Sequence, residues 1–282
     1  MTARVIVLGG RGFVGGAIAK SASAAGMEVI QVGRSDMDLA ATTTVLKLST
    51  MCTPEDLVVF AAAEAPCKTM DELRQNLAMT LNVIDALRTR PPTYLLNISS
   101  DAVYLDSETP LTESSPTGPS NLHGAMHAAR EHLLEAAGCP VMHLRPTLIY
   151  GAGDPHNGYG PNQFMSRARS GRPIEIFGRG EERRDHVHIQ DVAEVAVHCL
   201  SHRLRGRLNV ASGDTTSFRQ IADHVAALHD GKVEILERPR SGPMPHGGYR
   251  PIAIDELRDQ MPAFQPLNVL DGVRMEVHQN GQ

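Results

Sequence analysis

A seven-residue stretch near the N-terminus, Gly9-Gly10-Arg11-Gly12-Phe13-Val14-Gly15, has the composition of a phosphate-binding turn. It satisfies both G-x-x-G-x-x-G and G-x-G-x-x-G, and it joins the apolar run Arg4–Leu8 to an Ala-rich segment over residues 13–25. Glycines let a backbone turn tightly and approach a pyrophosphate, and a helix N-terminus offers free N–H groups and the positive end of its dipole. Because a strand precedes the turn and a helix follows it, we favour a dinucleotide-binding loop over a tight turn without a ligand.

The second apolar run, Glu28–Val32, ends at residues that could distinguish between two dinucleotides. An NAD-preferring enzyme usually places a carboxylate here to accept from the ribose 2′-OH. In this chain the first polar residue is Arg34, which could pair with a 2′-phosphate, and Ser35 could add a donor. Asp36 and Asp38 follow and could serve NAD instead. We therefore favour NADP over NAD, and an Arg34 that is only a solvated strand-end charge is the competing explanation.

The elements that must position these residues follow from the alternation of apolar runs and helical segments in the first half of the chain. Further strands are expected at residues 57–62, 94–98 and 141–144, with helices at 71–88 and 122–137 between them. A strand–helix–strand rhythm of this kind predicts an α/β fold, with a Rossmann-type, doubly wound parallel sheet.

The composition changes after Tyr150. Residues 151–161 are rich in Gly, Pro, Asn and Asp, which is typical of a functional loop. We expect a dinucleotide-binding Rossmann domain over residues 1–150 and a smaller C-terminal α/β substrate-binding domain over residues 151–282. Some later segments, at about residues 185–203, are expected to fold back onto the first domain.

Composition and charge exclude several function classes. The 282 residues are 41% hydrophobic, and 27 basic against 32 acidic side chains give a net charge of −5, so the basic field that nucleic acid or an anionic membrane would need is absent. No apolar run approaches 18 residues, and the first one stops at Gly9, so we expect neither a transmembrane helix nor a signal peptide. Widely spaced cysteines without a Cys-x-x-Cys favour buried thiols in a reducing cytoplasm. They are Cys52, Cys67, Cys139 and Cys199.

Several further motifs follow the glycine turn in order along nearly the whole chain. They are residues 57–63, Asn76, Asn82, the sequence ISSDAVY at 98–104, and residues 144–151 and 178–193. With these motifs the chain resembles the extended short-chain dehydrogenase/reductases, the NAD-dependent epimerase/dehydratase group that acts mostly on nucleotide sugars. The resemblance implies a set of cofactor-binding residues. They are Gly9, Gly12, Phe13, Val14, Gly15, Arg34, Ser35, Asp38, Leu39, Ala61, Ala62, Ala63, His127 and Pro146.

The resemblance also implies roles around the reacting carbon. Ser100 aligns with the Ser or Thr that hydrogen-bonds the reacting oxygen of the substrate, and Asp101 follows it as in the dehydratases and the keto-sugar reductases. Ala102 stands where the dehydratases carry Glu, which argues against dehydration because that reaction needs a second carboxylate. Leu148 lies where many members have a substrate-binding Asn, so the sugar pocket is expected to be unusual. The implied substrate-binding residues are Asn162, Arg184 and Arg250, with Arg184 on the nucleotide diphosphate.

The family's catalytic pair, Tyr-x-x-x-Lys on a helix, is absent from this chain. His123 stands at the Tyr position, His127 at the Lys position, and Glu131 follows where family members also carry Glu. A spacing of four places both imidazoles on one face of the helix.

Three explanations of the His pair remain open. In the first, His123 is the acid/base, because an unperturbed imidazole pKa of about 6.5 suits proton transfer at neutral pH, and His127 keeps the hydrogen bond to the ribose. In the second, the chain binds the dinucleotide without catalysis. In the third, His123, His127 and Glu131 hold a metal, but Gly124 after the first His breaks the His-Glu-x-x-His pattern, so we expect no metal.

The sequence therefore predicts a cytoplasmic, homodimeric NAD(P)-dependent oxidoreductase or epimerase that acts on a nucleotide-linked sugar. Ser100 and His123 would handle the proton, and Asp101 and His127 would complete the catalytic group. Reduction of a keto sugar is favoured over epimerisation, since NADP usually means net reduction. The alternative is a catalytically silent NAD(P)-binding protein that acts as a sensor or partner.

Overall fold

The structure is a computed structural model that describes residues 3–138 and 140–279. Contacts within the chain divide it into two compact units. The first comprises Met1–Leu105, Ser115–Pro146 and Val192–Leu208, and the second comprises Asp106–Ser114, Thr147–Asp191 and Asn209–Gln282.

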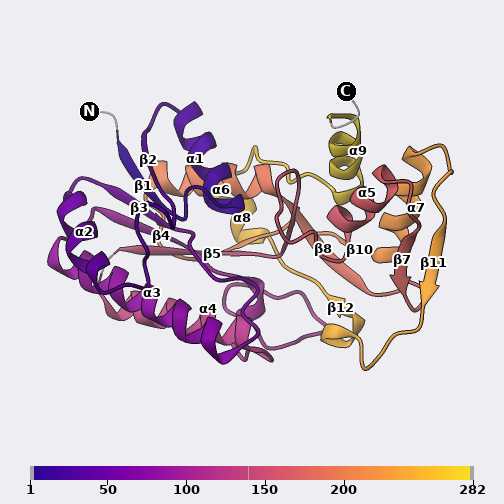
Figure 1. Ribbon diagram of the computed structural model, residues 1–282, viewed down its shortest axis with the longest axis horizontal. Helices are drawn as coiled ribbons and strands as arrows, with labels where there is room; N and C mark the ends of the chain where they lie inside the picture. Colours follow the sequence, from indigo (N-terminus) through magenta and orange to yellow (C-terminus); the bar gives the residue numbers. More distant parts are fainter. Residues whose placement is uncertain (1–2, 139, 280–282) are drawn as a thin grey trace. The chain divides into compact units, whose positions relative to one another are not determined.

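The first unit is built on a six-stranded sheet with the strand order β2-β1-β3-β4-β5-β9. Pairing from β2 through β5 is parallel, and helices cover both faces (Figure 1). This arrangement confirms the predicted Rossmann-type α/β fold. The strands are β1 (Arg4–Leu8), β2 (Glu28–Val32), β3 (Leu57–Phe60), β4 (Tyr94–Ile98), β5 (Val141–Pro146) and β9 (Gly206–Val210). The helices are α1 (Phe13–Ala24), α2 (Thr43–Met51), α3 (Met70–Thr89), α4 (Leu122–Ala136) and α6 (Ile189–His202).

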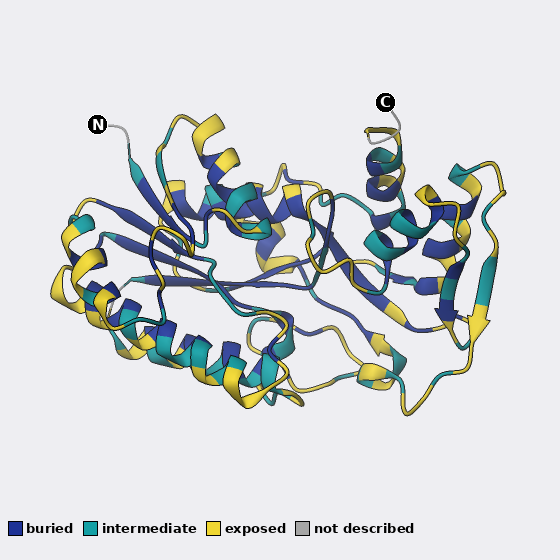
Figure 2. Cartoon of the chain, in the orientation of Figure 1, coloured by how far each residue is buried: buried dark blue, intermediate teal, exposed yellow. Residues whose placement is uncertain are grey.

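The central strands are buried along their whole length, as their apolar, β-branched sequences predict for a parallel sheet covered on both faces. Figure 2 shows these strands in dark blue, whereas the outer faces of α3 and α4 are exposed. One core cluster joins the sheet to α2, α3 and α4, and it includes Ile6, Val58, Phe60, Val83 and Leu134.

Local sequence signals set where the two long helices begin. Thr69 accepts a hydrogen bond from the Glu72 backbone N–H, and Glu72 bonds back to the Thr69 N–H, so α3 starts in a capping box. Asn121 caps α4 by accepting from the Gly124 N–H at 2.9 Å. These caps fix the first turns of both helices, and the first turn of α4 carries His123.

The second unit contains a sheet centred on β8 (Arg183–His188), which pairs with β6 (Leu148–Tyr150), β10 (Thr215–Ser217) and β12 (Tyr249–Arg250). A separate parallel pair joins β7 (Ile174–Phe177) to β11 (Ile235–Arg238). The hydrophobic core of the second unit includes Tyr150, Phe164, Phe218 and Val273. The other elements are α5 (Pro161–Arg169), α7 (Phe218–Leu228), α8 (Asp255–Gln260), α9 (Val269–Gln279) and two 3-10 turns, η1 (Asp101–Val103) in the first unit and η2 (Pro245–Gly248) here.

The two units differ at two places from the predicted domains, which covered residues 1–150 and 151–282. Residues 106–114 belong to the second unit, because Leu111 forms a β-bridge with Ile252 and accepts a hydrogen bond from the Asn209 side chain at 3.0 Å. Residues 192–208 belong to the first unit. The predicted returning segment, at about residues 185–203, overlaps this range but begins and ends earlier.

Two negative predictions concern the chain as a whole. Among residues 3–138 and 140–279, no helix is long and apolar enough to cross a membrane. Cys52, Cys67 and Cys199 are buried thiols outside any disulfide, and Cys139 lies outside the described residues.

Candidate active site

The glycine turn between β1 and α1 is closed tightly by its own backbone. The Gly9 N–H donates to the Val32 carbonyl at 2.8 Å, and the Gly12 N–H donates to the Gly9 carbonyl at 2.9 Å. Gly9 has φ +87°, and a Cβ there would lie 2.7 Å from the Ala62 backbone nitrogen. A Cβ on Gly15 would overlap the Gly9 carbonyl oxygen. The turn therefore requires glycine at both positions, and a backbone turn of this kind before a helix N-terminus suits a pyrophosphate.

The end of β2 is exposed and carries two ion pairs. Arg34, with 68% of its side chain exposed, pairs with Glu64 at 2.8 Å. Arg11 of the glycine turn pairs with Asp36 at 2.9 Å, and Asp36 also accepts from the Gly33 N–H at 2.8 Å. The Asp36 carboxylate is thus paired with Arg11, and the Arg34 guanidinium is paired with Glu64 while most of its side chain stays exposed. Sequence reasoning missed Arg11. The signal was a basic residue in the glycine turn together with the acidic residues Asp36 and Asp38 after β2.

Two buried or half-buried asparagines of α3 hold the loops that carry the other predicted cofactor residues. Asn76 donates to the Glu64 carbonyl at 2.9 Å and accepts from the Glu64 N–H at 3.0 Å, which fixes the chain directly after Ala61, Ala62 and Ala63. Asn82 donates to the Leu39 carbonyl at 2.9 Å, which holds the loop containing Asp38. The segments 61–63 and 38–39 therefore have defined positions at the carboxyl ends of β3 and β2.

The carboxyl end of β4 presents the predicted Ser-Asp pair. Ser100 caps η1 by accepting from the Ala102 N–H at 3.2 Å, and Asp101 is buried in the same turn. A Cβ on Gly124 would overlap the Ala102 carbonyl oxygen, so the first turn of α4 lies directly against η1. This close packing brings Asp101 near enough to His123 for its charge to act on the imidazole. Ser100, Asp101 and His123 thus share one region of the first unit.

The two histidines form an edge-to-face pair on α4. Their ring centroids are 4.7 Å apart with an interplanar angle of 85°. His123 Nδ1 accepts from the Cys67 backbone N–H at 3.4 Å, which places the proton of the neutral ring on Nε2. His127 is buried, and within the described chain its Nδ1 has no hydrogen-bond partner.

Burial keeps both imidazoles neutral. Desolvation lowers the pKa of His123 below its ordinary value, and the opposing effects of Asp101, which raises it, and Arg130, which lowers it, are smaller. The pKa of His127 lies well below the ordinary value because of burial, with added repulsion from His123 and Arg130. Protonation of His123 at Nδ1 would also break the hydrogen bond from the Cys67 N–H.

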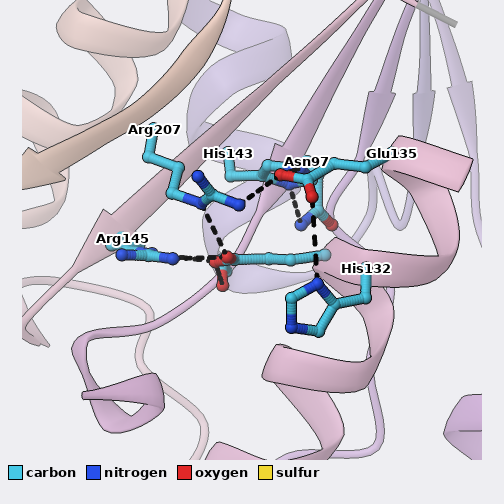
Figure 3. A network of polar contacts seen from close by, with 8 residues as sticks. Asn97, His132, Glu135, His143, Arg145 and Arg207 are labelled. Carbon is cyan, nitrogen blue, oxygen red and sulfur yellow. Dashed lines mark hydrogen bonds and ion pairs between the residues drawn. The ribbon is translucent and has the colours of Figure 1, made fainter. Parts of the chain in front are cut away.

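A polar network joins Glu131 and Glu135 of α4 to residues of the neighbouring strands, and its contacts are drawn in Figure 3. Glu131 accepts from the Ser99 hydroxyl at 2.5 Å and from Arg145 through Nε at 2.9 Å and Nη2 at 2.5 Å. Glu135 of the same helix pairs with Arg207 at 2.5 Å. The network ties β4, β5, β9 and α4 together at the strand end that carries Ser99 and Ser100. Arg145 was missed as a positioning residue, although a charge inside an apolar strand sequence signals a buried partner.

In the second unit the structure brings two of the three predicted substrate residues together. Arg184 on β8 and Arg250 on β12 are register partners of adjacent strands, and both are buried. Arg184 pairs with Glu182 at 3.5 Å, and Arg250 pairs with Asp106 at 2.5 Å. Asn162 lies apart from them and holds the 151–154 loop, because its oxygen accepts from the Gly151 N–H at 3.1 Å and its amide donates to Asp154.

No group of three or more His, Cys, Asp or Glu side chains with metal-binding geometry occurs in the part of the chain that the structure describes.

A glycine turn at the first strand of a parallel sheet, with a Ser-Asp pair at the end of the fourth strand, defines a Rossmann-type dinucleotide-binding protein. The model of the NAD-dependent epimerase/dehydratase family matches residues 5–211. The chain belongs to this family.

The sequence identity to individual relatives is low. A UDP-glucose 4-epimerase of Mycolicibacterium smegmatis is 28% identical over 194 residues, which are 64% of this chain and 61% of the relative. A dTDP-glucose 4,6-dehydratase of Xanthomonas campestris pv. campestris is 24% identical, and the aligned region covers 85% of this chain and 78% of the relative. The crystal structure of the Thermus thermophilus UDP-glucose 4-epimerase complex with NAD superposes with a TM-score of 0.82 at 24% identity, over 98% of both chains.

We predict that Glu131→Gln destabilises the protein strongly, because it removes the carboxylate that balances the buried charge of Arg145. The expected loss is about 3–5 kcal/mol of unfolding free energy, measured by urea denaturation at pH 7. Burial raises the pKa of Glu131, but the hydrogen bonds and charge of Arg145 lower it further, so the folded-state pKa lies below the ordinary value. The stabilisation that Glu131 provides is therefore fully present above the pKa of the unfolded chain, and it is lost as the pH falls through the lower folded-state pKa. The difference between the variant and the wild type should therefore narrow in acid.

The matched control is Glu135→Gln on the same helix, where the side chain is 37% exposed. Its cost should stay below about 1 kcal/mol, as for surface pairs. Equal losses for both variants would contradict a special role for Glu131.

Proposed function

We propose that the protein is an NAD(P)-dependent oxidoreductase or epimerase that acts on a nucleotide-linked sugar. The observation that carries this proposal is the cluster of Ser100, Asp101, His123 and His127 at the carboxyl end of β4, in the same unit as the glycine turn. Hydroxyl and imidazole groups at that place can handle the proton of an alcohol or ketone. The family description, which names NAD-dependent epimerases and dehydratases, supports the reaction class.

The residues present fit a bound dinucleotide. Gly9, Gly12 and Gly15 form a turn that any Cβ would fill or crowd, which supports close approach of a pyrophosphate to the N-terminus of α1. Phe13 and Val14 begin that helix, and Ala61, Ala62 and Ala63 leave small side chains at the end of β3. When bound, the nicotinamide supplies the group that accepts or donates hydride at a sugar carbon. Pro146, the last residue of β5, completes the proposed cofactor-binding set.

The proton-handling roles follow from the tautomer and burial of the His pair. His123 Nε2 carries the proton of the neutral ring, so it can donate a hydrogen bond to the sugar oxygen, and Ser100 Oγ provides a second contact. The neutral ring can take the alcohol proton at Nε2 only in its other tautomer, with the ring proton on Nδ1 and the hydrogen bond from the Cys67 N–H given up. The imidazolium formed in this way returns the proton in the reducing direction. His127 stays neutral and holds the ribose of the cofactor.

The proposed substrate is a nucleotide sugar because of the second unit and the relatives. Arg184 and Arg250 are neighbours in the β8–β12 pairing, and a diphosphate would compete with Glu182 and Asp106, the carboxylates that pair with them. The named activities of the two curated relatives concern UDP-glucose and dTDP-glucose. Ala102 in place of a second carboxylate favours hydride transfer without dehydration.

Three finer points belong to the same proposal. NADP is preferred, because Arg34 lies exposed at the end of β2, where a 2′-phosphate could replace Glu64 as its partner, and this preference favours reduction over epimerisation. The protein acts in the cytoplasm, in keeping with its buried free thiols. It forms a homodimer through α3 and α4, where exposed Leu81 and Met70 of α3 offer apolar surface.

The competing function is a silent dinucleotide-binding protein, which would show no hydride transfer.

His123→Phe should lower the single-turnover rate of hydride transfer by roughly 10²–10⁴-fold, the usual contribution of a general acid or base. Cofactor binding should survive. Because the pKa of His123 is lowered, the wild-type oxidation rate should fall only at a pH below the titration range of an ordinary histidine, while the reduction rate should rise there. Wild-type rates in the variant, measured against pH with a panel of keto sugars, would move the proton to another group.

Arg34→Ala should weaken NADP binding far more than NAD binding, by about 1.5–3 kcal/mol, the value of a charge-assisted hydrogen bond. Calorimetric titration of both dinucleotides measures the difference. The companion variant Glu64→Gln frees Arg34 from its ion pair and should not weaken NADP. An equal loss for both dinucleotides in Arg34→Ala would exclude Arg34 as the 2′-phosphate contact.

Arg184→Ala should raise the dissociation constant for UDP or dTDP by roughly ten- to hundredfold, in keeping with the loss of about 1.5–3 kcal/mol for a charged hydrogen bond. Dinucleotide affinity should not change. Arg183→Ala, at the exposed neighbouring position of β8, is the control and should bind normally. A free sugar that outperforms every nucleotide sugar would disprove the substrate proposal.

A further inference from the structure

Arg130 is a fully buried arginine in the middle of α4. Only 1% of its surface is exposed, and its guanidinium carbon lies 4.2 Å from the centre of the Phe60 ring. Nη2 makes a long hydrogen bond of 3.4 Å to Asn76 Oδ1, an oxygen that also accepts from the Glu64 N–H. Within residues 3–138 and 140–279, Nε and Nη1 have no hydrogen-bond partner. Buried arginines are ordinarily satisfied by several acceptors, so Arg130 is unusual.

The charge of Arg130 is also not balanced by a nearby acid. The described residues contain many arginine–carboxylate ion pairs, and none of those within 4.0 Å includes Arg130. Burial lowers its pKa to about 10, which still leaves the guanidinium protonated at neutral pH. The ring face of Phe60 offers only a cation–π contact in place of an anion. An unpaired buried cation of this kind costs folding free energy, so packing alone does not account for it.

The position of Arg130 relative to the His pair gives its charge a function. It lies three residues after His127 and seven after His123, on the same face of α4. The charged groups that act on His123 are Asp101 of η1 and Arg130, and those that act on His127 are His123 and Arg130. Cys67 adds the N–H that faces His123 Nδ1. Arg130 is therefore a positive charge that acts on both imidazoles.

We propose that Arg130 is a positioning residue whose buried positive charge adds to the effect of burial in keeping His123 and His127 in their neutral forms. This inference deepens the proposed function, because a neutral pair offers one N–H donor and one lone pair per ring.

The test compares Arg130→Met, which removes the charge and keeps a long side chain, with Arg130→Lys, which keeps the charge. Arg88→Met, at an exposed position of α3, controls for the loss of one positive charge. Histidine titrations followed by NMR of imidazole-labelled protein report each ring separately. In Arg130→Met the titration midpoints of His123 and His127 should move to higher pH, and exposed His202 should not change. Arg130→Lys and Arg88→Met should resemble the wild type.

Thermal melting provides a readout that separates this role from a structural one. Removal of an unpaired buried charge should leave the melting temperature of Arg130→Met equal to or above that of the wild type. A folded Arg130→Met protein with unchanged titration midpoints would overturn the proposal. So would a loss of melting temperature in Arg130→Met that Arg130→Lys fully restores without any difference in the midpoints.

The outcome does not depend on turnover. If the titration midpoints move as expected but no keto sugar is reduced, the role of Arg130 stands and the proposed enzymatic function fails. If the midpoints do not move while hydride transfer proceeds, the function stands and the role of Arg130 fails.

Discussion

The carboxylate of Glu131 is the interaction on which the arrangement of the first unit depends. It is buried, and it receives the Ser99 hydroxyl and two nitrogens of Arg145. A buried carboxylate is tolerable only when its oxygens are fully bonded, so α4, β4 and β5 can occupy only a narrow range of relative positions. That constraint fixes the strand end from which Ser100 and Asp101 project. It also fixes the rotation of α4, and with it the direction of His123 and His127.

Helix α4 combines groups of different chemistry on its inward-facing turns. His123 and His127 lie near η1, Arg130 lies over Phe60, and Glu131 enters the network behind Ser99. Neutral rings, an unpaired cation and a paired anion follow one another within three turns. Because burial penalises charge, each group reaches its state through its neighbours: Arg145 preserves the anion, whereas burial and Arg130 disfavour protonation of the rings.

The cofactor face depends on a second constraint, the close approach of backbone segments. Gly9 lies against Ala62, and the segments after β2 and β3 are held by the side chains of Asn82 and Asn76 from α3. The loops at this edge of the sheet are therefore positioned by specific hydrogen bonds. A preformed backbone surface of this kind reduces the ordering that a ligand must impose when it binds.

Local patterns in the sequence determined the glycine turn, the order of strands and helices, and the placement of His123 and His127 on one helix face. These follow from backbone sterics and from periods of about 2 and 3.6 residues, which short segments already contain. Only the tertiary structure decided that the Cys67 N–H faces His123, that Arg130 lacks an acid, that Asn162 holds a loop, and that residues 106–114 join the second unit. Protonation states and hydrogen-bond partners depend on desolvation and on groups far apart in the chain, such as the Cys67 N–H and His123. Those quantities do not exist before the chain has packed.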